Sequence, residues 1–75
     1  MGDRLAQDHR AVAVERSRMR GWNVVAPDSG WLISAHNSES AAVAAARKAV
    51  AASGGGVVIH GFGATAAVLE EAIEA

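Results

Sequence analysis

The segment WNVVAPDSGWLISA, residues 22–35, decides the fold, because a turn sequence separates two short strand-forming runs. Residues 22–26 and 31–35 are rich in aromatic and β-branched side chains, which favour β-strands. Between them Pro27 takes the second position of a β-turn and is followed by Asp28, Ser29 and Gly30, all common turn residues. The segment therefore predicts a β-hairpin.

A helix is predicted after the hairpin, over residues 41–52, where alanine, the best helix former, dominates. Residues 37–40, NSES, supply several N-cap candidates and an acidic residue for the first turn. Gly54, Gly55 and Gly56 follow, and glycine ends helices because it adopts the left-handed conformation without steric cost. The helix should meet a sheet through a face of small residues, chiefly Val43, Ala46 and Val50.

Two further elements are expected. Residues 57–60, VVIH, predict a third strand, and residues 65–74 predict a short C-terminal helix that keeps Val68, Leu69 and Ile73 on one side. The expected order is ββαβ followed by that helix. We therefore expect an α+β fold with a small antiparallel sheet, formed by residues 21–75 as a single small α/β domain.

The N-terminal segment, residues 1–20, stays unassigned because its periodicities conflict. A weak helical stripe is formed by Leu5, His9, Val12, Arg16 and Met19, whereas residues 11–15 alternate like a strand. A mobile basic tail is the third interpretation.

The size of the chain favours association. A chain of 75 residues makes one domain, and 18 of its residues are alanine, which bury little area each. A core of this size rarely contributes more than about 3–5 kcal/mol. The chain has no cysteine, so disulfides and most structural zinc sites are excluded. We expect self-association or attachment to a larger protein.

Charge and hydropathy narrow the function classes. No apolar run approaches the roughly 20 residues that span a bilayer, and no signal sequence is recognisable, so we expect a cytoplasmic protein with no membrane partner. Residues 1–20 hold five arginines against three acids, whereas residues 21–75 hold two bases against five acids. A nucleic-acid partner is therefore not favoured, because a binder normally places its basic residues on the folded part.

One glycine-rich motif follows the third predicted strand. The sequence GFGATA, residues 61–66, formally matches a dinucleotide-binding fingerprint, but no second strand follows to complete the unit. A flexible turn is the preferred interpretation. A weak anion site at the start of the C-terminal helix is the alternative, and its residues would be Gly61, Gly63, Ala64 and Thr65.

No catalytic or metal site is predicted. The histidines His9, His36 and His60 lie at no spacing that places two on one helical face, and the serines occur in cap and turn contexts. We expect no cofactor and no enzymatic activity. Trp22 and Trp31 are interpreted as core residues or subunit contacts, with stacking on nucleic-acid bases as the alternative.

A family resemblance rests on Gly30-Trp31, the alanine-rich helix with Arg47, and His60-Gly61. Over residues 22–63 the chain resembles domain of unknown function 2188, a family of small bacterial proteins. The polar residues that usually follow the His-Gly pair are replaced by Phe62, Gly63 and Ala64. The resemblance implies the order of elements and supplies no activity.

The preferred function is a non-catalytic interaction or accessory module, either a homo-oligomer or a small subunit of a larger protein. Its predicted interface comprises Trp22, Val68, Leu69 and Ile73. The alternative is a nucleic-acid-binding domain that uses the N-terminal arginines and the tryptophans, and the minor alternative is phosphate or nucleotide binding at residues 61–66.

Overall fold

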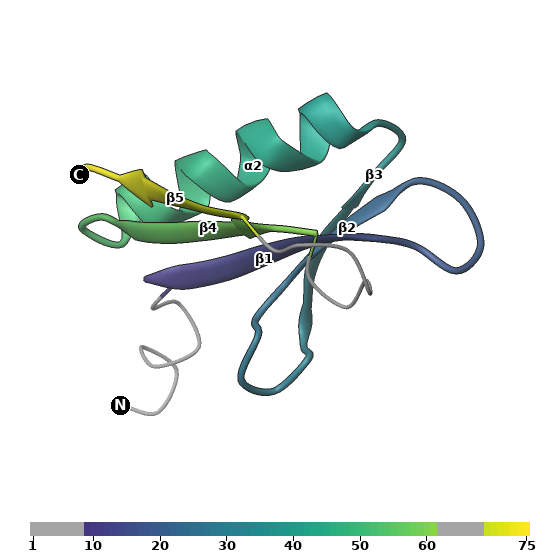
Figure 1. Cartoon of the computed structure of the whole chain (residues 1–75), viewed down its shortest axis with the longest axis horizontal. Coiled ribbons are helices and arrows are strands. Elements are labelled where there is room, and N and C mark those ends of the chain that lie inside the picture. The colour runs from purple at the N-terminus through teal and green to yellow at the C-terminus, as the bar shows by residue number, and fades with distance from the viewer. Residues whose placement is uncertain (1–8, 62–68) are drawn as a thin grey trace.

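A mixed β-sheet with one helix against one of its faces makes up the part of the chain that the computed structural model describes, residues 9–61 and 69–75 (Figure 1). Its elements are β1 (Ala11–Arg16), β2 (Trp22–Val25), β3 (Leu32–His36), α2 (Glu39–Ala52), β4 (Gly56–His60) and β5 (Leu69–Ile73).

The strands lie in the order β3-β2-β1-β4-β5, so the first strand of the chain is the central one. β1 pairs antiparallel with β2 and parallel with β4, while β2–β3 and β4–β5 are antiparallel pairs. The parallel pair brings together the hairpin half of the chain and the half that follows the helix.

The predicted fold class is wrong in two elements. The sheet is five-stranded and mixed rather than small and antiparallel, and residues 69–73 form a strand where a C-terminal helix was expected. The unassigned N-terminal segment supplies β1. The expected hairpin and the central helix are present, with shifts of one or two residues at their ends.

β1 forms because its alternation matches a strand that is covered by a helix. Val12 and Val14 point to the α2 side and are buried, while the small Ala13 occupies the other face and is also fully buried. Alternation with period 2 therefore prevails over the weak helical stripe, because only the strand places both valines in the core.

β5 is a strand for a related reason. Leu69, Glu71 and Ile73 alternate toward the α2 side, where Ile73 packs against the core. In a helix, the acids at 70, 71 and 74 would have crowded the C-terminal end, where the macrodipole disfavours negative charge. In the strand, Glu71 instead meets the side chains of Arg47 and His60.

The core lies between α2 and the sheet. The helix starts at its N-cap Ser38, whose side chain accepts a hydrogen bond from the Ala41 N–H at 3.2 Å. Its predicted small-residue face is confirmed, since Val43, Ala46 and Val50 are buried. The buried residues from both layers are Val12, Val14, Val24, Ala42, Val43, Ala46, Val50 and Val58.

The junction of β1 and β4 requires glycine. A Cβ at Gly56 would lie 1.8 Å from the carbonyl oxygen of Arg10, the same oxygen that accepts a hydrogen bond from the Val57 N–H at 2.9 Å. The parallel pairing therefore begins at a backbone approach that excludes any side chain.

Candidate interaction surfaces

The two edge strands of the sheet differ in charge. β3 and the residue before it read Trp31-Leu32-Ile33-Ser34-Ala35-His36 and contain no acid, lysine or arginine. β5 carries Glu70 and Glu71 and is followed by Glu74. An edge strand exposes unpaired backbone groups, and charge is a common protection against pairing with another chain. β5 has this protection and β3 lacks it.

Exposed apolar side chains mark the start of β3. Trp31 is 75% exposed and Leu32 is 57% exposed, and Trp31 is held at the hairpin by its carbonyl, which accepts from the Ala26 N–H at 2.9 Å. The interpretation of Trp31 as a core residue is therefore wrong. Trp31 directly follows the turn between β2 and β3, and that turn lies away from α2 (Figure 1).

A polar cluster joins β5 to the helix and to β4. Arg47 Nε donates to both carboxylate oxygens of Glu71, at 3.2 and 3.0 Å, and His60 Nε2 donates to Glu71 Oε1 at 3.0 Å. The hydrogen bonds from His60 and then from Arg47 lower the pKa of Glu71 below its usual value. The cluster fastens the edge strand to α2 and holds the carboxylate ionised.

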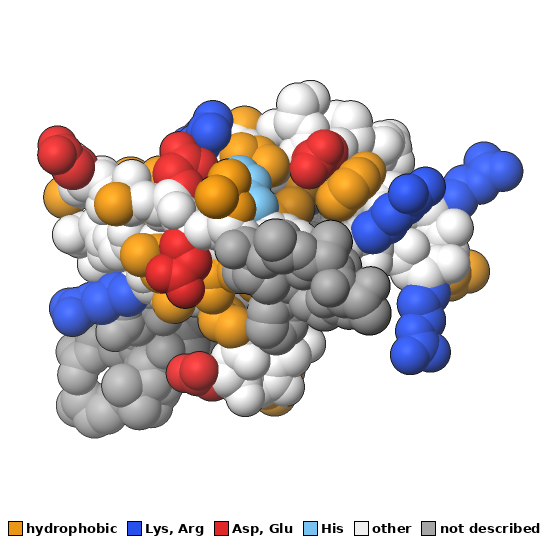
Figure 2. Space-filling view, viewed as in Figure 1, with side chains coloured by type: hydrophobic (Ala, Val, Ile, Leu, Met, Phe, Trp, Pro, Cys, Tyr) orange, Lys and Arg blue, Asp and Glu red, His pale blue; other side chains and the backbone are white. Residues whose placement is uncertain are grey.

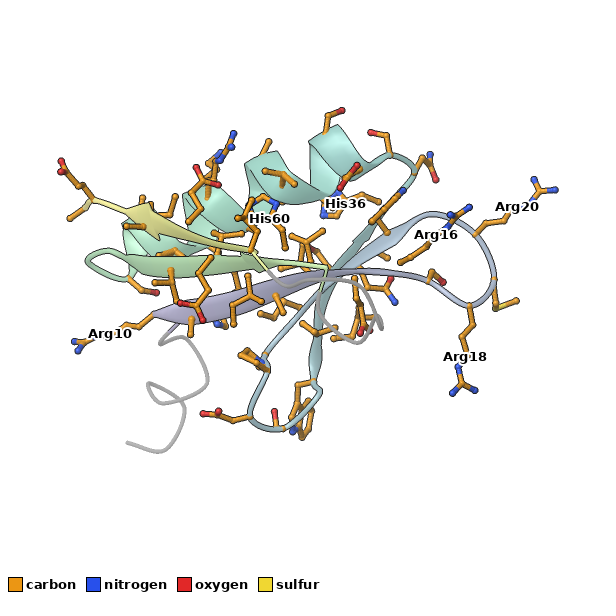
Figure 3. The ribbon with its side chains drawn as sticks, viewed as in Figure 1. Arg10, Arg16, Arg18, Arg20, His36 and His60 are labelled. Atoms are coloured by element: carbon orange, nitrogen blue, oxygen red, sulfur yellow. The ribbon has the colours of Figure 1, made fainter. Side chains whose placement is uncertain are left out.

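Both histidines on the α2 side of the sheet have a side-chain partner in a strand. His60 is engaged by Glu71, and His36 Nε2 lies 2.8 Å from the hydroxyl oxygen of Ser34, two residues away in β3 (Figure 3). Within residues 9–61 and 69–75, no three His, Asp or Glu side chains are grouped as metal ligands. Each of these two histidine side chains therefore lies within hydrogen-bond distance of a side chain of the sheet.

The predicted anion site lies mostly outside the described residues. Gly61 follows β4 directly and has φ +82°, and its N–H donates to the Val14 carbonyl at 3.2 Å. Gly63, Ala64 and Thr65 fall in the undescribed range 62–68. The C-terminal helix on which this site depended is replaced by β5 over residues 69–73.

The predicted interface residues are separated. Leu69 is 68% exposed, whereas Ile73 and Trp22 are half-buried and pack against the core, and Val68 lies outside the described residues. Of the described members, Leu69 is therefore the one that is largely exposed.

Sequence reasoning missed a basic surface on the folded domain. The loop of residues 17–21, which joins β1 to β2, carries Arg18 and Arg20, and Arg16 ends β1 beside it. Their side chains gather at one end of the molecule (Figures 2 and 3). The sequence shows that the arginines recur at every second residue. Their position in the fold could not be predicted without knowing that residues 11–16 form a central strand.

The chain matches no protein-family model, no curated protein and no solved structure. The resemblance of residues 22–63 to domain of unknown function 2188 stays a prediction. In the part of the chain that the structure describes, no helix has both the length and the apolar character needed to cross a lipid bilayer.

Proposed function

We propose that this chain is a non-catalytic cytoplasmic interaction module that pairs with a second copy of itself through the free edge of β3. The proposal rests on one observation: β3 is an edge strand without an acidic residue, lysine or arginine, and the exposed Trp31 and Leu32 lie at its start.

Self-pairing is selective for β3 because like charges oppose the other edge. In an antiparallel pair of β5 strands centred on Glu71, that residue would face its own copy, and a shift of one residue would place Glu70 opposite Glu71. Like charges directly opposite each other destabilise a strand pair. A β3 pair centred on Ser34 places Ile33 opposite Ala35 and Leu32 opposite His36 of the second copy, with no such repulsion.

The energy balance of the small domain also favours this pairing. The core of the described residues is built from alanine and valine, so the isolated chain has little stability to spare. Pairing satisfies the outward backbone groups of β3, and it covers apolar area at Trp31 and Leu32, which contributes roughly 25 cal/mol per Å² of area buried.

Light scattering coupled to size-exclusion chromatography at about 10–100 μM chain tests the proposal, because the dimer population rises with the chain concentration. We expect about twice the 7.7 kDa of one chain. Ala35→Glu adds a charge at an exposed β3 position and should give a folded monomer. Ala44→Glu makes the same change at an exposed position of α2 and should leave the dimer intact.

A wild-type chain that stays monomeric throughout this range would contradict the proposal, and it would leave attachment to a larger protein as the alternative. A dimer that persists in Ala35→Glu would also contradict it. Circular dichroism of each variant separates loss of pairing from loss of folding.

A further inference from the structure

The basic surface at the β1–β2 connection is the strongest feature that self-pairing does not use. Arg16, Arg18 and Arg20 recur every second residue and are all exposed, and Met19 between them is 90% exposed. We call residues 16–20 the arginine loop. In Figure 3 Arg18 and Arg20 point away from the sheet in different directions.

The arginine loop is held in place by its own hydrogen bonds. The Ser17 N–H donates to the Gly21 carbonyl at 3.0 Å, and the Ser17 hydroxyl accepts from the Met19 N–H at 3.2 Å. Gly21 has φ +86°, and a Cβ there would lie 2.3 Å from the His36 carbonyl oxygen. The base of the loop is therefore fixed against β3, which lowers the conformational entropy that a ligand would have to remove.

Among the residues that the structure describes, no acidic side chain pairs with the arginines of this loop. Within residues 9–61 and 69–75, Arg18 and Arg20 have no ion pair, and Arg16 lies over the ring of Trp22, 5.9 Å from its centre. The acids Glu70, Glu71 and Glu74 lie in or after β5, at the opposite side of the sheet from the β2–β3 half. Three like charges on one loop are stabilised by an anionic ligand.

We propose that the arginine loop binds the phosphate backbone of double-stranded nucleic acid. All the basic residues of the loop are arginines, and the planar guanidinium of arginine binds phosphate through two parallel hydrogen bonds. A duplex presents closely spaced phosphates to a protruding loop and needs no sequence contact from it.

The positions of the aromatic residues favour a duplex over a single strand. Single-strand binders stack bases on exposed aromatic rings beside a basic groove. Here Trp22 is half-buried under Arg16 and packs against the core, and the exposed Trp31 lies beyond the other end of β2. The loop therefore offers charge without a stacking platform.

Fluorescence anisotropy of the full chain with a labelled 20-base-pair DNA duplex tests this proposal. Three phosphate contacts predict a slope of about −2.7 for log affinity against log salt, or roughly 40-fold weaker binding at 200 mM than at 50 mM salt. Arg18→Gln or Arg20→Gln should reduce that loss to about 12-fold, because each removes one contact. Lys48→Gln, which removes an exposed positive charge from α2, should keep the wild-type slope.

A second measurement locates the contact. On adding the duplex, the amide signals of residues 17–21 should shift, while those of α2 stay in place. The proposal is overturned if no saturable binding occurs at the lowest salt, or if Lys48→Gln weakens binding as much as Arg18→Gln does. Tighter binding of a single-stranded oligonucleotide, or equal binding of polyglutamate, would overturn it as well, the latter by identifying the loop as a site for acidic proteins.

Discussion

Gly56→Ala should destabilise the protein more than any other single glycine-to-alanine change at the end of α2. The new Cβ would lie 1.8 Å from the Arg10 carbonyl oxygen, and real Cβ contacts stay beyond 3.0 Å, so the backbones of β1 and β4 must separate by about 1.2 Å. The hydrogen bond from the Val57 N–H to that oxygen, 2.9 Å long, would then be lost. A broken pair of buried backbone groups costs about 1–3 kcal/mol, and the distortion of the strand ends brings our expectation to about 3 kcal/mol.

Gly54→Ala is the matched control, because Gly54 has φ +100° but nothing within 4 Å of the added Cβ. It should cost only the backbone strain of about 1–2 kcal/mol. Urea denaturation followed by far-ultraviolet circular dichroism, at equal chain concentrations, measures both variants. Since a core of this size rarely contributes more than about 3–5 kcal/mol, Gly56→Ala should be largely unfolded at 37 °C. Equal losses in the two variants would refute the steric argument.

Two other predictions concern side chains. Trp31→Ala should change the free energy of unfolding by less than about 0.5 kcal/mol, since Trp31 is 75% exposed. Trp22→Ala should lower it by about 2 kcal/mol, because Trp22 packs on the core. Urea titrations of dilute, monomeric samples measure both changes, and a larger loss in Trp31→Ala than in Trp22→Ala would contradict this prediction. The lowered pKa of Glu71 means that its contribution to stability is complete above the ordinary value of 4.5 and is lost as the pH falls through the lowered value. Unfolding midpoints at pH 7 and about pH 3.5 should therefore differ less in Glu71→Gln than in the wild type, and an NMR titration should find the Glu71 pKa raised in Arg47→Ala; an unchanged pKa would show that His60 alone sets it.

The predictable part of the fold was the part with strong local signals. Pro27 and Gly30 between two β-forming runs predict the hairpin. The alanines predict the helix, together with the serines before it, of which Ser38 is the N-cap. The strand at residues 57–60 matches β4, Gly56–His60. These elements need only neighbouring residues to be specified, and each is present in the structure.

β1 and β5 could not be assigned because their partners are distant in sequence. β1 pairs with β4 through contacts such as Val12 to Val58, and β5 becomes a strand by pairing with β4 and by bringing Glu71 to Arg47. Local periodicity did not decide between helix and strand for β1, and it favoured a helix for β5. The basic surface could not be predicted for the same reason, because the arginine loop has a fixed place only once β1 is known to be a strand of the sheet.

The central position of β1 determines when the chain can fold during synthesis. β1 leaves the ribosome before every other described element, yet one of its two neighbours, β4, follows only after residues 17–55. Until β4 is made, one edge of β1 has no partner strand, and Val12 and Val14 lack the core contacts that β4 provides. Pairing that spans so many residues must first overcome the entropy of closing the loop. Because this pairing closes a longer loop than any other strand pair of the described sheet, we expect the docking of β4 beside β1 to be the slow step of folding.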